Sequence, residues 1–110
     1  MLHPRRLALV VLAGLGLAAC DPQAAMDNVA RSAARSVVVP VVNQYLPGAE
    51  AEVAAICIID NASVQEIQSL ARDVGTRAGT TTVATILAVA QRPATLQCLL
   101  GRGLAPLPRA

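Results

Sequence analysis

The chain has 110 residues, with nine basic and seven acidic side chains, and its one aromatic residue is Tyr45. This length allows one small domain, and a core built almost entirely from aliphatic side chains leaves such a domain marginally stable unless a disulfide or a partner supports it. All basic residues are Arg, and a net charge of +2 gives no support to nucleic-acid binding.

The first twenty residues have the organisation of a secretory signal. Arg5 and Arg6 form a basic start, an apolar run covers residues 7–17, and two small residues precede Cys20. The run is shorter than the roughly 20 residues that a membrane-spanning helix needs. Residues 17–20, Leu-Ala-Ala-Cys, resemble the lipobox of bacterial lipoproteins. The alternatives are an ordinary cleaved signal with an incidental Cys and an uncleaved membrane anchor.

The lipobox resemblance implies where the protein resides. It implies a signal peptide over residues 1–19, cleavage before Cys20 and lipidation of Cys20, so that the protein is lipid-anchored in the cell envelope and faces the periplasm. Asp21 resembles an inner-membrane retention signal of enteric bacteria, which favours the inner membrane over the outer one. A chain that begins at Cys20 has seven Arg and seven acids, so its net charge is close to zero.

The residue inventory also restricts the chemistry. His3, the only histidine, lies in the predicted signal, and the chain has no Lys. These facts exclude Ser–His and Cys–His nucleophile pairs, histidine-based zinc sites and Schiff-base lysines. We therefore expect no enzymatic activity, no catalytic residue, no cofactor and no metal. Asp60, Asn61 and Arg92 are the polar residues to test first for function, although helix capping or solvation accounts for each of them.

The segment from Pro22 to Tyr45 has apolar residues at three- and four-residue steps, which predicts a helix. Pro40 interrupts it, so we expect either a kink or two shorter helices. Arg31 and Arg35, four residues apart, form a second face that is either solvated or in contact with anionic lipid headgroups.

After a turn at Pro47 and Gly48, residues 51–59 are nearly all apolar and favour a buried helix. The competing fold class is α+β, with residues 37–42 and 54–59 as strands. Ser63 and Glu66 have the spacing of a capping box, in which each side chain bonds the backbone N–H of the other residue. The helix that they begin is expected to reach Val74.

Two further helices are expected in the C-terminal part. One of Thr80, Thr81 and Thr82 is predicted to cap the first of them, which should stop near Gln91 because of Pro93. The second covers residues 94–100 and is followed by two glycines. The predicted domain organisation is thus a signal at 1–19, a helical domain at 20–103 and a flexible tail at 104–110.

If Cys20 carries lipid, Cys57 and Cys98 remain as an even pair in an oxidising compartment. We predict a disulfide between them, with two buried thiols as the alternative. The predicted fold is all-α, a small bundle of three to five short helices stapled by this disulfide.

Residues 57–63 (Cys-Ile-Ile-Asp-Asn-Ala-Ser) and 92–99 (Arg-Pro-Ala-Thr-Leu-Gln-Cys-Leu) resemble short motifs of small alphaproteobacterial lipoproteins. The resemblance implies that the two Cys-bearing helices pair, and it implies no activity, cofactor or catalytic residue. We expect a non-enzymatic accessory or structural component that acts by contact with an envelope protein. The alternatives are a membrane-active small lipoprotein and a small-ligand binder or sensor.

Overall fold

The computed structural model describes residues 22–75 and 78–109. This part of the chain forms five helices: α2 (Pro22–Val42), α3 (Gly48–Asp60), α4 (Val64–Ala71), α5 (Thr80–Ala90) and α6 (Pro93–Gly101). It contains no strand, so the all-α prediction is confirmed and the α+β alternative is wrong for the described ranges.

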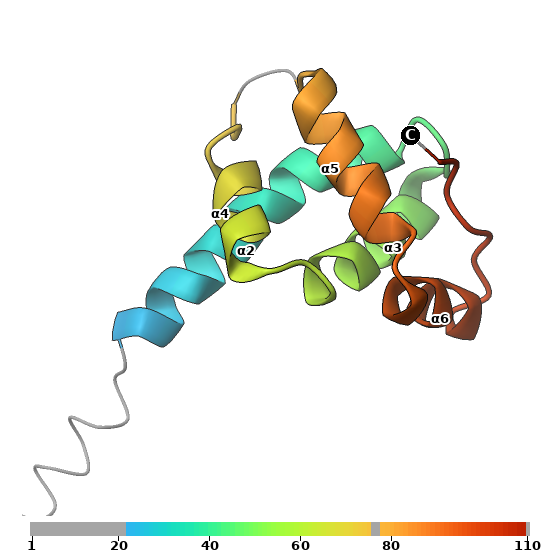
Figure 1. The fold of residues 1–110 in the computed structure, drawn as a ribbon, viewed down its shortest axis with the longest axis horizontal. Coiled ribbons are helices and arrows are strands. Elements are labelled where there is room, and N and C mark those ends of the chain that lie inside the picture. The colour runs from blue at the N-terminus through green and yellow to red at the C-terminus, as the bar shows by residue number, and fades with distance from the viewer. Residues whose placement is uncertain (1–21, 76–77, 110) are drawn as a thin grey trace, which may run out of the picture.

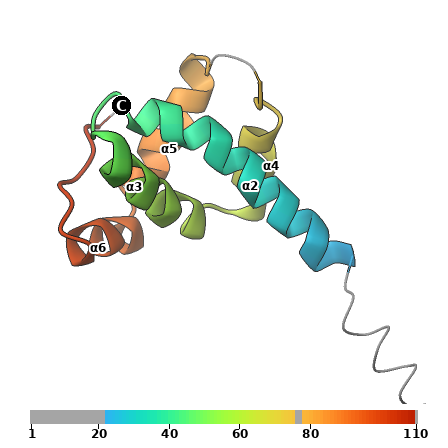
Figure 2. The ribbon, with the colours of Figure 1, turned by 180° about the vertical axis from the view of Figure 1, so that it is seen from behind.

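Helix α2 is the longest element, and α3 and α4 pack against it, whereas α5 and α6 pack against α3. It crosses behind α4 and α5 in Figure 1 and in front of them in Figure 2, and its first turns project beyond the rest of the domain in both views. Pro40 lies inside α2, near its end. Pro40 has no N–H to donate to the preceding turn, yet the helix continues to Val42. The alternative of two shorter helices is therefore wrong.

The core is entirely aliphatic apart from Cys57 and Thr95. Val38 and Val42 of α2 and Ile58 of α3 are fully buried in it, whereas Tyr45 lies outside this core, 42% exposed. The other helices contribute large side chains that are fully buried or nearly so: Leu70, Ile86, Val89 and Leu99. Residues 51–59 are thus a buried helix segment, as predicted.

Helix α4 starts as predicted and ends earlier. Its last residue is Ala71 rather than Val74, and turns with hydrogen bonds from Asp73 N to Leu70 O and from Val74 N to Ala71 O follow. Gly75 then adopts a φ of +80°, a left-handed conformation that glycine favours.

The start of α5 differs from expectation. Gly79 occupies the N-cap position and no threonine side chain caps the helix. Thr82 instead donates its hydroxyl to the Asp73 carboxylate, which links α5 to the turn after α4. The end is as predicted, because α5 stops at Ala90 and Pro93 begins α6.

The segment predicted as a flexible tail outside the domain is packed on it, so the predicted domain boundary at residue 103 is wrong. The N–H of Leu104 bonds Leu99 O and that of Gly103, at φ +74°, bonds Leu100 O, which is the Schellman arrangement. This turn directs the chain back, and Leu104 and Leu107 are buried in the core. Gln91 Nε2 also donates to Leu107 O at 2.7 Å.

Candidate functional site

The predicted lipidation site, Cys20, lies outside the described residues. Pro22, two positions later, is the first residue of α2. In the sequence, Cys20 precedes the end of α2 that projects from the domain in Figures 1 and 2. The side chains of this end are therefore the described ones nearest to Cys20 in the sequence.

The projecting part of α2 does not bury the apolar face that its sequence pattern predicts. Met26 and Val29 are 67% and 69% exposed, and burial begins only at Ala34. The other helices cover the early turns only on the side of Ala30 and Arg31, and they do not reach Met26 and Val29. Gln23 Nε2 bonds Asp27 Oδ1 at 3.2 Å on the polar side of the same turns.

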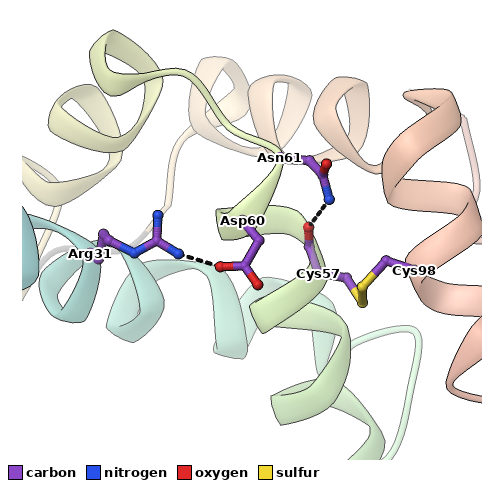
Figure 3. The surroundings of a disulfide bond; sticks show 5 residues. All are labelled: Arg31, Cys57, Asp60, Asn61 and Cys98. Atoms are coloured by element: carbon purple, nitrogen blue, oxygen red, sulfur yellow. Dashed lines mark hydrogen bonds and ion pairs between the residues drawn. A yellow bond between two sulfur atoms is a disulfide. The ribbon is translucent and has the colours of Figure 1, made fainter.

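The two arginines of α2 are held by acids of α3. Arg31 Nη2 pairs with Asp60, as Figure 3 shows, and Arg35 Nη2 pairs with Glu52 Oε2 at 2.6 Å. Both pairs are about half exposed, so their contribution to stability is small, on the order of 0–1 kcal/mol each. Asp60 thus has a structural partner, and the Arg31/Arg35 face is directed at α3.

The predicted disulfide between Cys57 and Cys98 is present. It joins α3 to α6 with a Cα–Cα distance of 5.7 Å, within the range for unstrained disulfides. Asn61 follows α3 and donates its Nδ2 to Cys57 O at 2.8 Å, which satisfies a carbonyl at the helix end. Asn61, like Asp60, therefore supports the end of α3 beside the disulfide.

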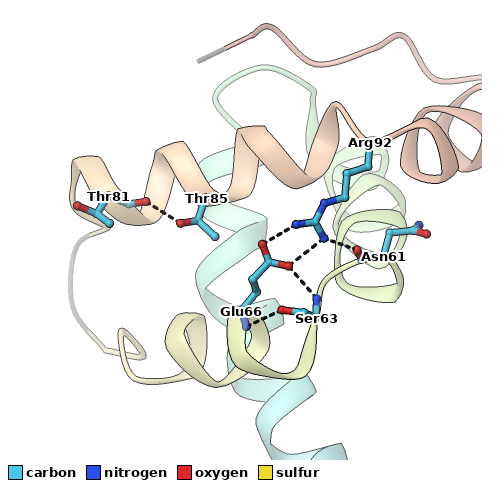
Figure 4. Close-up of polar contacts among 6 residues, drawn as sticks. All are labelled: Asn61, Ser63, Glu66, Thr81, Thr85 and Arg92. Carbon is cyan, nitrogen blue, oxygen red and sulfur yellow. Dashed lines mark hydrogen bonds and ion pairs between the residues drawn. The ribbon is translucent and has the colours of Figure 1, made fainter.

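The capping box at α4 is confirmed, and Arg92 extends it (Figure 4). Glu66 N donates to Ser63 Oγ at 3.1 Å, and Ser63 N donates to Glu66 Oε1 at 2.8 Å. Arg92 Nη1 and Nη2 donate to Glu66 Oε1 and Oε2 at 2.9 and 2.7 Å, and Nη1 also donates to Asn61 O at 2.8 Å.

The Arg92 guanidinium holds the pKa of Glu66 below its ordinary value. Partial burial of the carboxylate acts in the opposite direction, and the hydrogen bonds from Ser63 lower the pKa further. Sequence reasoning found the box but not the Arg92 contact, for which 26 residues of separation leave no local signal.

Among the surface hollows that border α2, two combine apolar and polar lining from α2 and a later segment. A groove of about 190 Å³ lies between α2 and α4, with Ala30, Ile67 and the 59% exposed Val64 as its apolar side chains and Asp27, Arg31 and Gln68 as its polar ones. A cleft of about 290 Å³ lies between the later turns of α2, the segment before α5 and the start of α5. Its apolar lining includes Val37, Pro40, Val41 and Val83, and its polar lining includes Ser36, Gln44 and Asp73.

Within residues 22–75 and 78–109, no three His, Cys, Asp or Glu side chains are grouped as a metal site. No single helix of these ranges is long and apolar enough to cross a membrane. Helices α5 and α6 reach that length and apolar character only when taken together, and they are bent by 73° relative to each other. Thr95 is the one buried polar side chain of the described part whose oxygen has no hydrogen-bond partner, and it lies in neither hollow.

Comparison with protein families, with curated proteins and with solved structures finds no match.

Proposed function

We propose that the protein is a lipid-anchored component of the cell envelope that faces the periplasm and acts, without catalysis, through contact with an envelope protein. The observation that carries the proposal is the adjacency of Cys20 and α2: one residue, Asp21, separates the lipobox cysteine from the first helical residue. A lipid on Cys20 would hold the domain directly at the membrane surface. Asp21 supports the inner membrane as the location.

The disulfide supports the same compartment. Disulfides persist in oxidising environments such as the bacterial periplasm and are rare in the cytosol. The Cys57–Cys98 bond joins two helices of a small aliphatic core, where a covalent link contributes most to stability.

The groove between α2 and α4 is the surface best suited to a protein partner. Val64 is 59% exposed at its edge, and Ala30 and Ile67 add apolar surface beneath. Asp27 and Gln68 supply polar groups at the rim, which is the arrangement of many protein interfaces. An apolar side chain of a partner helix would fit such a groove.

The anchor is tested by membrane fractionation of a Cys20→Ser variant. We expect this variant to leave the membrane fraction, whereas retention at the wild-type level would contradict lipid anchoring. Intact-mass measurement of the membrane-bound wild type should show a chain that begins at Cys20 and carries acyl groups.

The partner is tested by in-cell crosslinking of a tagged protein followed by mass spectrometry. We expect one dominant crosslinked envelope protein that Val64→Asp removes. Leu100→Asp is the matched control, because Leu100 is 60% exposed on α6, away from the groove. Equal crosslinking in both variants would contradict the groove as the contact.

The cleft beside α5 favours a second candidate function, the binding of a small ligand. Its apolar lining with a few polar groups is typical of ligand sites, although its volume of about 290 Å³ is at the small end of their range. We expect Val83→Met, which fills the cleft, to abolish any ligand-dependent rise in thermal midpoint found in a screen of small amphipathic compounds. The same rise in Val83→Met and wild type would exclude this cleft.

A further inference from the structure

The first three turns of α2 carry an apolar face that no described part of the chain covers. Ala25, Met26 and Val29 are exposed, and Ala33 is half-buried at the inner end. At 100° per residue these four side chains span an arc of about 100° around the helix, the width of the apolar stripe of an amphipathic helix. We call these four residues the outer face of α2.

The charged side chains of the same turns lie on the other side of the helix. Asp27 and Arg31 are each about 150° or more from the middle of the outer face. Asp27 accepts a hydrogen bond from Gln23, and Arg31 is paired with Asp60 of α3. The outer face is thus directed away from the ion pairs that fasten α2 to the domain.

The position of this face relative to Cys20 selects its occupant. Met26 and Val29 lie four and seven residues beyond Pro22, which places them about 6 and about 10 Å along the helix axis from its start. Apolar faces of interfacial helices enter the boundary between headgroups and acyl chains by about 5–10 Å. For a helix that lies in this boundary and starts two residues after a lipidated cysteine, the axial distances keep Met26 and Val29 beside the attached acyl chains.

We propose that the outer face of α2 lies on the bilayer, with Met26 and Val29 inserted among the lipid headgroups. This proposal rests on the lipid anchor of the proposed function and adds the orientation of the domain. Interfacial helices commonly need basic residues to bind. Here the acyl chains at Cys20 supply the binding, so an apolar face without free arginines is sufficient. The groove beside Val64, which Asp27 and Arg31 line, then opens on the side of α2 away from the bilayer, where the periplasmic part of a partner can reach it.

The chain contains no Trp, so one introduced indole reports its own surroundings. We would purify lipidated V29W and L100W proteins and reconstitute each in phosphatidylcholine vesicles with and without bromine on the acyl chains. Both positions are more than half exposed, so neither indole disturbs the core. Helix α6, which carries Leu100, lies at the end of the domain far from the start of α2 in both views (Figures 1 and 2).

We expect brominated lipid to quench roughly half of the V29W emission, because bromine acts at the depth that interfacial side chains reach, and to leave L100W emission unchanged. Flotation of the same samples reports the anchor separately. V29W that floats with vesicles but is not quenched would overturn the bilayer contact while retaining the anchor, and would leave the outer face to a protein. Equal quenching of V29W and L100W would overturn the proposed orientation, and failure of both lipidated proteins to float would overturn the anchor and this proposal together.

Discussion

Arg92 and Glu66, 26 residues apart in the chain, form a bidentate ion pair. Arg92 Nη1 donates to Glu66 Oε1 at 2.9 Å, and Nη2 donates to Oε2 at 2.7 Å. Because Arg92 also donates to Asn61 O, one side chain ties the start of α4 and the end of α3 to the junction of α5 and α6 (Figure 4). Glu66 in turn closes the capping box with Ser63. A local capping motif is thereby connected to the tertiary structure.

Arg92→Gln is expected to lower the free energy of unfolding by about 1 kcal/mol, measured by urea denaturation. The loss includes the paired hydrogen bonds and the contact with Asn61 O, and it is limited because the Arg92 side chain is 42% exposed to solvent. Arg92→Lys keeps the charge but not the bidentate geometry, so it should lower the free energy of unfolding by an intermediate amount. Arg109→Gln, at an exposed position outside any described ion pair, is the control and should change stability by less than about 0.5 kcal/mol.

The same pair predicts a pH dependence of stability. The pKa of Glu66 is lowered in the folded protein, whereas in the unfolded chain it returns to about 4.3. The stabilisation is therefore fully present above about pH 4.3 and is lost as the pH falls through the lower folded value. Glu66→Gln and Arg92→Gln should both flatten the stability curve in this acid range. An unchanged acid slope in either variant would show that other carboxyl groups determine it.

Loss of the disulfide is expected to be the largest single change. Cys57 and Cys98 are separated by 41 positions, and in the chain-entropy model closing a loop of this length contributes roughly 4 kcal/mol. The Cys57→Ala/Cys98→Ala double variant should therefore unfold at a much lower temperature or fail to fold. Alkylation with mass spectrometry checks the bond directly, because both thiols should react only after reduction.

Thr95→Val is expected to stabilise the protein by about 1 kcal/mol. The Thr95 side chain is fully buried in α6, and its oxygen has no partner within the described ranges. Valine has nearly the same shape and removes the cost of an unpaired buried hydroxyl. Thr85→Val is the control, because Thr85 Oγ1 donates to Thr81 O at 3.0 Å and gains nothing from the change. A destabilised Thr95→Val protein would mean that a bound water satisfies the hydroxyl.

Leu107→Ala tests whether the final segment belongs to the domain. Leu107 is buried in the core, so its truncation should cost about 2–3 kcal/mol in guanidinium denaturation. The exposed Leu100 is the matched position, and Leu100→Ala should remain within about 0.5 kcal/mol of wild type. Equal stability of both variants would show that residues 104–110 behave as a flexible tail.

Local features of the chain were predictable because their causes lie within a few residues. The Ser63–Glu66 spacing determines the start of α4, and Pro93 determines the break between α5 and α6. The pairing of Cys57 with Cys98 was predictable because they are the two cysteines that remain when Cys20 is assigned to lipid. The cap of α5 was missed, since Thr82 finds a better partner in Asp73 than in its own helix.

Burial and long-range pairing required the tertiary structure. Met26 and Val37 lie on the same side of α2, yet Met26 is exposed and Val37 is buried, because on that side only the later turns are covered by the rest of the domain. Leu107 is buried because a turn after α6 brings it back onto the core. The sequence by itself thus determined the helices, the capping box of α4 and the lipobox pattern, which depend on neighbouring residues. Only the packing of the helices decided which apolar side chains remain at the surface and which acid Arg92 meets, because both depend on contacts between segments that are distant in the chain.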